Sequence, residues 1–369
     1  MEAQKPARLD ALTGLRCFAA LNIVFFHFSN PDWFGPFAPV VNAGYLSVSF
    51  FIMLSGFVLA YNYAGRAQLD KQDPKRLDKV RFWKARFTRL YPIYLLSLAL
   101  GWQTFLGERA AHTHVMFWWG AVLTPLLLQG WVPELATFGN TPAWTMSAEA
   151  SYYVFFPWVA ALKPPRRVSG HLWRLGALWM LGMIPGILYV IYNPDGIAVV
   201  DRFSSAPWLN ALKFTPIPHL PSFVFGVLLA GLDEVVDRTG WLRLTLGLVG
   251  FAGIYAVLMQ GPRVPYAIIH DGLLMPLFGC LILSLAGINP LSKLFGFRAF
   301  VFVGESSYCL YLMHFNLWNL LHQSGLLPAL GLSWLDPWIS YVILIALGLL
   351  ALHLVEKPAQ KLLRRWMGA

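Results

Sequence analysis

Charged side chains are scarce in this sequence of 369 residues, because Asp, Glu, Lys and Arg make up 12% of it and hydrophobic residues 57%. So little charge leaves too few polar groups to cover a soluble protein of this size. The three cysteines lie far apart in apolar stretches, which excludes a disulfide framework or a metal site read from their spacing. A Gly-rich phosphate loop, a Ser-His-Asp arrangement and metal-ligand spacing of histidines are also absent, so we predict no metal. The composition indicates a polytopic membrane protein.

Apolar runs suitable for helices fill the chain, which predicts an all-α bundle forming one membrane domain over residues 1–369, with no appended soluble domain. The runs cover residues 11–28, 44–63, 89–107, 115–130, 148–162, 172–191, 217–232, 241–259, 266–287, 300–321 and 336–355. The first run has spanning length and no small-residue cleavage site, so it is expected to remain as the first helix.

The basic residues indicate the topology. All but four of the 28 Lys and Arg residues cluster in six segments, and the four left over are Arg109, Arg202, Lys213 and Arg263. Because cytoplasmic segments carry the excess of positive charge, we place the six rich segments in the cytoplasm. Segments rich and poor in basic residues then lie on opposite sides of the membrane in turn, provided that the region around 112–144 makes no net crossing. We therefore predict about ten transmembrane helices, both termini cytoplasmic, and residues 116–131 re-entrant or flat at the outer interface. Alternatively, this run spans the membrane and the following loop dips back into it, which would also leave both termini on the same side.

The first apolar run, LDALTGLRCFAALNIVFFHF, carries three ionisable side chains. Asp10 lies at its entrance, Arg16 about two turns in, and His27 eleven residues beyond Arg16, or roughly 16 Å further along a helix. Ionisable groups inside a membrane span are costly enough to be candidates for function. His27 is therefore a candidate in the outer half of the membrane, the alternative being a histidine packed near the interface.

Two more titratable residues are expected in the same layer. Glu149 in TPAWTMSAEASYY would lie near the outer start of its helix, and His314 in SSYCLYLMHF in the outer half of an outward-running helix, with Tyr311 on the same face. A carboxylate beside an imidazole fixes its tautomer and stabilises its protonated form, as a general base requires. The alternatives are that Ser147 and Glu149 only cap their helix and that His314 is structural.

A basic pair lies on the cytoplasmic side. In KARFTRLYPIYLL, Arg86 and Arg89 are three residues apart and so share one helix face at the membrane boundary. Paired guanidinium groups can hold phosphates through charge-assisted hydrogen bonds. Alternatively, such residues set the orientation of the helix or bind anionic lipid headgroups.

Six segments together resemble the membrane acyltransferase 3 family of O-acyltransferases. They are LDALTGLRCFAALNIVFFHF, FFIMLSGFVLAY, RFTRLYPIY, AWTMSAEASYYVFFP, SSYCLYLMHF and HLVEKPAQKLLRR, in the expected order over nearly the whole chain. The resemblance implies transfer of an acyl group, usually acetyl, from cytoplasmic acyl-coenzyme A to a hydroxyl of a sugar or lipid-linked acceptor. It matches the family histidine to His27, the Arg-x-x-Arg pair to Arg86 and Arg89, and the Ser-x-Glu motif to Ser147 and Glu149.

This chain departs from the family in two respects. Many members carry an appended extracytoplasmic esterase-like domain, whereas this sequence ends directly after its last apolar run, so direct transfer to the acceptor is expected. The common second carboxylate after the Ser-x-Glu motif is replaced by Ala150, which argues against a two-carboxylate mechanism.

These observations lead to one hypothesis. Arg86 and Arg89 bind the phosphates of acetyl-coenzyme A, its long arm threads the bundle, and His27 deprotonates the acceptor hydroxyl while Glu149 orients the imidazole. Transient acylation of His27 is an alternative. The hypothesis predicts a protein of the bacterial cytoplasmic (inner) membrane that modifies polysaccharides, contacts membrane lipids and binds no nucleic acid. The rival interpretations are a transporter or flippase for a lipid-linked sugar or organic anion, and a membrane sensor.

Overall fold

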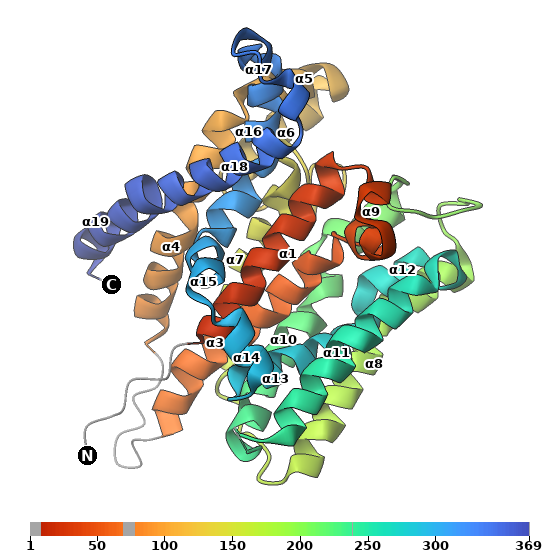
Figure 1. Ribbon diagram of the computed structural model, residues 1–369, viewed down its shortest axis with the longest axis vertical. Helices are drawn as coiled ribbons and strands as arrows, with labels where there is room; N and C mark the ends of the chain where they lie inside the picture. Colours follow the sequence, from red (N-terminus) through yellow and green to blue (C-terminus); the bar gives the residue numbers. More distant parts are fainter. Residues whose placement is uncertain (1–8, 69–77, 238, 369) are drawn as a thin grey trace.

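The structure, a computed structural model, describes residues 9–68, 78–237 and 239–368. Apart from an isolated bridge between Thr239 and Ile288, regular structure in this part of the chain is helical, which confirms the predicted all-α class. Helix α1 (Asp10–Phe28) crosses the middle of the bundle in Figure 1. It contacts helices from both halves of the sequence, including α3 (Leu46–Gln68) and α16 (Ser307–Gln323).

Six stretches of helix are long and apolar enough to cross a membrane. They are α1, the Leu46–Tyr63 part of α3, α8 (Val168–Tyr192), α9 with α10 (Pro207–Phe214 and Pro216–Val235), α11 (Trp241–Met259), and α18 through the π-helical η7 to α19 (Trp338–Ala351, Leu352–Glu356 and Lys357–Met367). These apolar stretches indicate an integral membrane protein. The predicted number of ten crossings and the cytoplasmic position of both termini stay predictions.

The other predicted runs are interrupted or carry more charge. They form α4 (Lys79–Leu100), α7 (Trp144–Val159), α12 (Tyr266–Ile268), the π-helical η5 (Ile269–Leu273), α13 (Met275–Ala286), α15 (Arg298–Glu305) and α16. The predicted run 300–321 breaks at Ser306, whose hydroxyl donates to the Val303 carbonyl at 2.8 Å. Such side-chain bonds to the backbone compete with the helical ladder.

The segment predicted as re-entrant folds back on itself. Helix α5 (Trp102–Ala111) is followed by α6 (His114–Leu123), whose 10 residues span about 15 Å, half the thickness of a hydrocarbon core. The chain then reverses, and the Tyr91 hydroxyl of α4 donates to the Pro125 carbonyl at 3.0 Å. The segment is therefore a hairpin, and its re-entrant or flat position in the membrane stays a prediction.

Most of the return from this hairpin to α7 is buried or half-buried within the bundle. It contains η2 (Gln129–Trp131) and η3 (Thr141–Ala143). Asn140 is fully buried and donates to the Ser97 hydroxyl at 3.1 Å and the Leu312 carbonyl at 2.9 Å. The return therefore ties α7 to α4 and α16.

Helices α3 and α10 pack closely through small residues. A Cβ atom added at Gly56 would lie 2.1 Å from the Phe223 carbonyl oxygen, and one at Gly226 would lie 1.9 Å from that of Met53. Only glycine permits this approach of the two backbones. The shorter elements are η1 (Pro31–Phe37), α2 (Ala38–Asn42), η4 (Gly261–Arg263), α14 (Pro290–Phe295), α17 (Leu326–Ala329) and η6 (Ser333–Leu335).

Candidate active site

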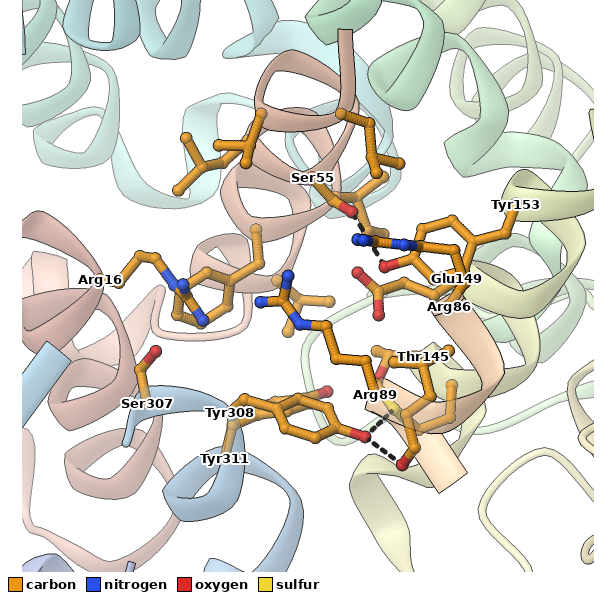
Figure 2. A pocket seen from close by; sticks show the side chains of 18 residues that line it. Arg16, Ser55, Arg86, Arg89, Thr145, Glu149, Tyr153, Ser307, Tyr308 and Tyr311 are labelled. Atoms are coloured by element: carbon orange, nitrogen blue, oxygen red, sulfur yellow. Dashed lines mark hydrogen bonds between the residues drawn. The ribbon is translucent and has the colours of Figure 1, made fainter. Parts of the chain in front are cut away.

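A cavity of about 110 Å³ lies between α1, α3, α4, α7 and α16. Figure 2 shows its polar side chains converging from these helices. They are Arg16, Ser55, Arg86, Arg89, Thr145, Glu149, Tyr153, Ser307, Tyr308 and Tyr311. We call this space the arginine cavity. Five of the predicted site residues line it, namely Arg16, Arg86, Arg89, Glu149 and Tyr311. His27 does not line it.

The predicted pair Arg86 and Arg89 faces the cavity from one side of α4. Arg86 donates to the Tyr63 hydroxyl at 3.1 Å, and its guanidinium lies 5.5 Å from the centre of the Tyr63 ring. Its Nε atom is buried and has no hydrogen-bond partner among the described residues. A buried donor of this kind is available to a ligand.

The helix that carries this pair begins earlier than the predicted apolar run, and the position of the pair at the membrane boundary stays a prediction. Helix α4 begins at Lys79, after Asp78 caps it by accepting from the Arg81 amide at 3.0 Å, and not at residue 89. Arg89 therefore lies ten residues, or about 15 Å, along the helix. The sequence did not reveal this because basic residues in the first turns of α4 interrupt its apolar run.

Arg16 supplies the third guanidinium of the cavity. It is close enough to Arg89 for their charges to repel, and both are attracted by Glu149 and by Glu356 of η7. Glu356 also accepts a hydrogen bond from the Cys309 thiol at 2.9 Å. Our sequence reasoning missed Glu356 as a site residue, although it lies in the quoted HLVEKP segment.

Glu149 lies with the arginines and not with His27. Its carboxylate faces Ser55 and Tyr153, whose hydroxyls are 3.4 Å apart, and its charge interacts with Arg89 and Arg16. The predicted contact between Glu149 and His27 is therefore wrong. Arg16 shares the cavity with Glu149, and His27 is eleven residues, roughly 16 Å, beyond Arg16 on the same helix.

Glu149 was placed wrongly because the predicted start of its helix, α7, was too late in the sequence. The apolar run begins at 148, but the helix begins at Trp144, after a buried approach from the hairpin that apolar patterning does not reveal. Helix α7 has no side-chain cap, so the capping alternative for Ser147 and Glu149 is also wrong. Ser147 instead accepts a hydrogen bond from the Gly130 amide at 3.2 Å, which holds η2 against α7.

His27 pairs with His314. The two rings lie 5.3 Å apart between centroids, on α1 and α16. Nδ1 of His314 is hydrogen-bonded to the Tyr311 carbonyl, and its Nε2 is buried without a hydrogen-bond partner in the described structure. Because a carbonyl only accepts, Nδ1 carries the proton and Nε2 has a free lone pair.

Tyr311 lies between the histidine pair and the arginine cavity. Its ring lines the cavity and is 6.0 Å from the His314 ring between centroids. Its hydroxyl donates to the Pro142 carbonyl at 3.3 Å. Asp10 is the first residue of α1 and lies outside the cavity lining.

The arrangement is suited to anions. Three guanidinium groups and one carboxylate line the arginine cavity, and charge-assisted bonds from arginine are strongest to phosphate and carboxylate. Within the described ranges, no group of three or more His, Cys, Asp or Glu side chains is arranged to hold a metal ion.

Comparison with known proteins gives the family. A family model described as an acyltransferase domain matches residues 9–354. Acyltransferase MdmB of Streptomyces mycarofaciens is 30% identical over 329 residues, which cover 84% of this chain and 78% of that protein. O-acetyltransferase OatA of Staphylococcus aureus is 23% identical over 340 residues, and the match spans 84% of this chain but only 50% of OatA. No solved structure matches the chain. The chain therefore belongs to the acyltransferase 3 family of membrane acyltransferases.

Proposed function

We propose that the protein transfers an acyl group from cytoplasmic acyl-coenzyme A to a hydroxyl of a saccharide or lipid-linked saccharide. The group would be acetyl, which members of this family usually transfer. The acceptor would be outside the bacterial cytoplasmic membrane. The name of OatA, an O-acetyltransferase, supports the reaction type. The observation that carries the proposal is the set of three guanidinium groups lining one cavity inside a membrane bundle.

The arginine cavity would bind the donor. A cavity of about 110 Å³ has room for a phosphate group but not for a whole coenzyme A. Arg86, Arg89 and Arg16 would hold phosphate oxygens, with the buried Nε of Arg86 as one donor. Glu149 would balance the positive charge, which corrects the role that we expected from the sequence.

The histidine pair would perform the proton transfer. His27 takes the proton of the acceptor hydroxyl, whose oxygen attacks the thioester carbonyl. The C–O bond forms, the C–S bond breaks, and the departing thiolate takes the proton from His27. Nε2 of His314, whose Nδ1 proton is held by the Tyr311 carbonyl, would accept a hydrogen bond from the His27 imidazolium. His314 would thus be the positioning residue that we expected Glu149 to be.

The test uses the whole chain in proteoliposomes with acetyl-labelled coenzyme A and a glycoside acceptor. The proposal is supported if label is transferred to a hydroxyl and this transfer requires His27. Movement of the acceptor across the bilayer without acylation would instead favour a transporter or flippase. Equal transfer by wild type and His27→Ala would remove the histidine from the reaction.

A further inference from the structure

A second and larger cavity lies near the end of α1, where the lining residue Arg202 approaches Phe26, the neighbour of His27. Neither His27 nor His314 lines it. Its volume is about 900 Å³, and it is a partly open space lined by α2, the residues just before α3, the end of α8, the loop 197–203, the end of α11 and α12. We call it the loop cavity. Its walls contain four aromatic rings and apolar side chains of the loop and of α11. The aromatic residues are Tyr45, Tyr189, Phe203 and Tyr266.

One cation enters this mostly apolar space. The guanidinium of Arg202 lies 5.0 Å from the centre of the Phe26 ring and 4.5 Å from that of Phe203. Its Nη1 atom is buried and has no hydrogen-bond partner in the ranges that the structure describes. Arg202 as a whole is half-buried, but a buried donor without a partner is rare in folded proteins, so this nitrogen is available to a ligand.

The loop that carries Arg202 is held rigidly. Lys213, only 5% exposed, donates from Nζ to the Arg202 carbonyl at 3.2 Å and to the Ser204 carbonyl at 2.7 Å. Asp201 accepts from the amides of Phe203 and Ser204 at 2.9 and 2.8 Å. The hydrogen bond from the Ser204 hydroxyl lowers the pKa of Asp201, so this turn stays closed at neutral pH. These bonds hold the backbone that carries Arg202, and its guanidinium rests against the rings of Phe26 and Phe203.

Arg202 is also close to the reacting histidine. Its charge acts on His27, the neighbour of Phe26, and on Tyr45, which directly precedes α3. The nearby positive charge of Arg202 repels the protonated form of the His27 imidazole. An anion bound to Arg202 would offset that repulsion at the moment when His27 takes up a proton.

We infer that the loop cavity is the acceptor site and that Arg202 recognises an acidic group, phosphate or carboxylate, on an amphipathic glycoside. The apolar faces of the acceptor pack on the aromatic wall, and the acidic group binds the free Nη1 of Arg202. This inference rests on the proposed function, because it names the acceptor of the same reaction. Both sources of the anion, a phosphate of a lipid-linked sugar and the carboxylate of an acidic sugar, share this chemistry.

The test measures binding without any donor. The full-length protein in lipid nanodiscs is titrated by calorimetry with octyl glucoside, octyl glucuronide and octyl glucoside phosphate. We expect an acidic glycoside to bind about tenfold more tightly than octyl glucoside, as one charge-assisted contact implies. Arg202→Gln should remove this preference while leaving octyl glucoside binding unchanged. Whichever acidic probe binds more tightly identifies the source of the anion.

Two variants make the test decisive. Arg202→Lys keeps the charge and should retain part of the preference even if the Gln variant folds poorly. Arg109→Gln, an exposed arginine on α5, is the matched control and should bind all three glycosides as wild type does. Equal binding of the three glycosides by wild type, or an acidic preference that survives in folded Arg202→Gln, would overturn the inference.

A donor assay separates the two proposals. If the same nanodiscs transfer acetyl from coenzyme A in a His27-dependent way but show no acidic preference, the acceptor inference alone fails. If the acidic preference depends on Arg202 but no transfer to any glycoside occurs, the loop cavity binds acidic amphiphiles and the proposed reaction fails.

Discussion

The rings of His27 and His314 lie 5.3 Å apart, with an angle of 36° between their planes, on helices that are nearly 300 positions apart in the sequence. His314 is fully buried, and one of its ring nitrogens is bound to the backbone of its own helix. The pair thus consists of a histidine with a fixed tautomer and a second histidine at the end of α1.

The first prediction concerns the histidine pair. His27→Ala should lower the rate of acyl transfer by about a hundredfold or more, because general base catalysis contributes that much. His314→Gln should lower kcat less and change the pH dependence of kcat, since it removes the acceptor for the His27 imidazolium. Measured pH profiles of transfer in proteoliposomes would check both. An unchanged profile in His314→Gln would make His314 a packing residue.

The second prediction concerns the donor. Arg89→Gln should weaken binding of acetyl-coenzyme A about tenfold, because one charge-assisted bond to phosphate is lost. Equilibrium binding of labelled donor to the purified protein measures this. Arg81→Gln is the control, since Arg81 lies on the same helix but is exposed outside the cavity. Equal affinities of wild type and Arg89→Gln would limit this arginine to a structural role.

The third prediction separates Glu149 from the base. Glu149→Gln removes the negative charge that faces Arg89 and Arg16, so the cavity becomes more positive. The KM for acetyl-coenzyme A should then fall by about threefold, as expected for stronger attraction of phosphates. The pH profile of kcat should stay that of wild type. A shifted profile would return Glu149 to the role of orienting His27.

The fourth prediction tests the contact between α3 and α10. Gly56→Ala should destabilise the protein by about 1–3 kcal/mol, because the new methyl group overlaps the Phe223 carbonyl and overpacks the interface. Thermal unfolding in detergent measures the change. Gly107→Ala on α5 is the control, since its added Cβ meets nothing within 4 Å. Gly56→Ala unfolding at the wild-type temperature would contradict the close packing.

The fifth prediction concerns topology. Single cysteines at Gly35, between α1 and α2, and at Gly196, in the loop after α8, should react with a membrane-impermeant maleimide added to intact cells. A cysteine at Lys293 in α14 should react only after the cells are opened. The reason is that the first two lie in segments poor in basic residues and the third in a basic one. The opposite pattern would contradict the predicted orientation.

Much of the fold could be predicted because a bilayer imposes strong local rules. A run of apolar residues must be helical there, so the positions of α1, α8 and α11 follow from hydropathy alone. Helix ends were harder to predict. Charged first turns concealed the start of α4 at Lys79, and the buried polar approach to α7 moved its start to Trp144. Side-chain bonds and a π-helical turn broke two predicted runs into shorter helices.

The chemistry of the candidate residues was visible in the chain itself, because an ionisable side chain inside an apolar run is rare and costly wherever it occurs. This property singled out Arg16, His27 and Glu149 from the sequence alone, and the three-residue spacing of Arg86 and Arg89 indicated the arginine pair. Which of them meet was a question of packing between helices, where a shift of a few residues in one helix start moves a side chain by several ångströms. Helix packing placed Glu149 with the guanidinium groups, paired His27 with His314, and brought Arg202 from a distant loop to the end of α1.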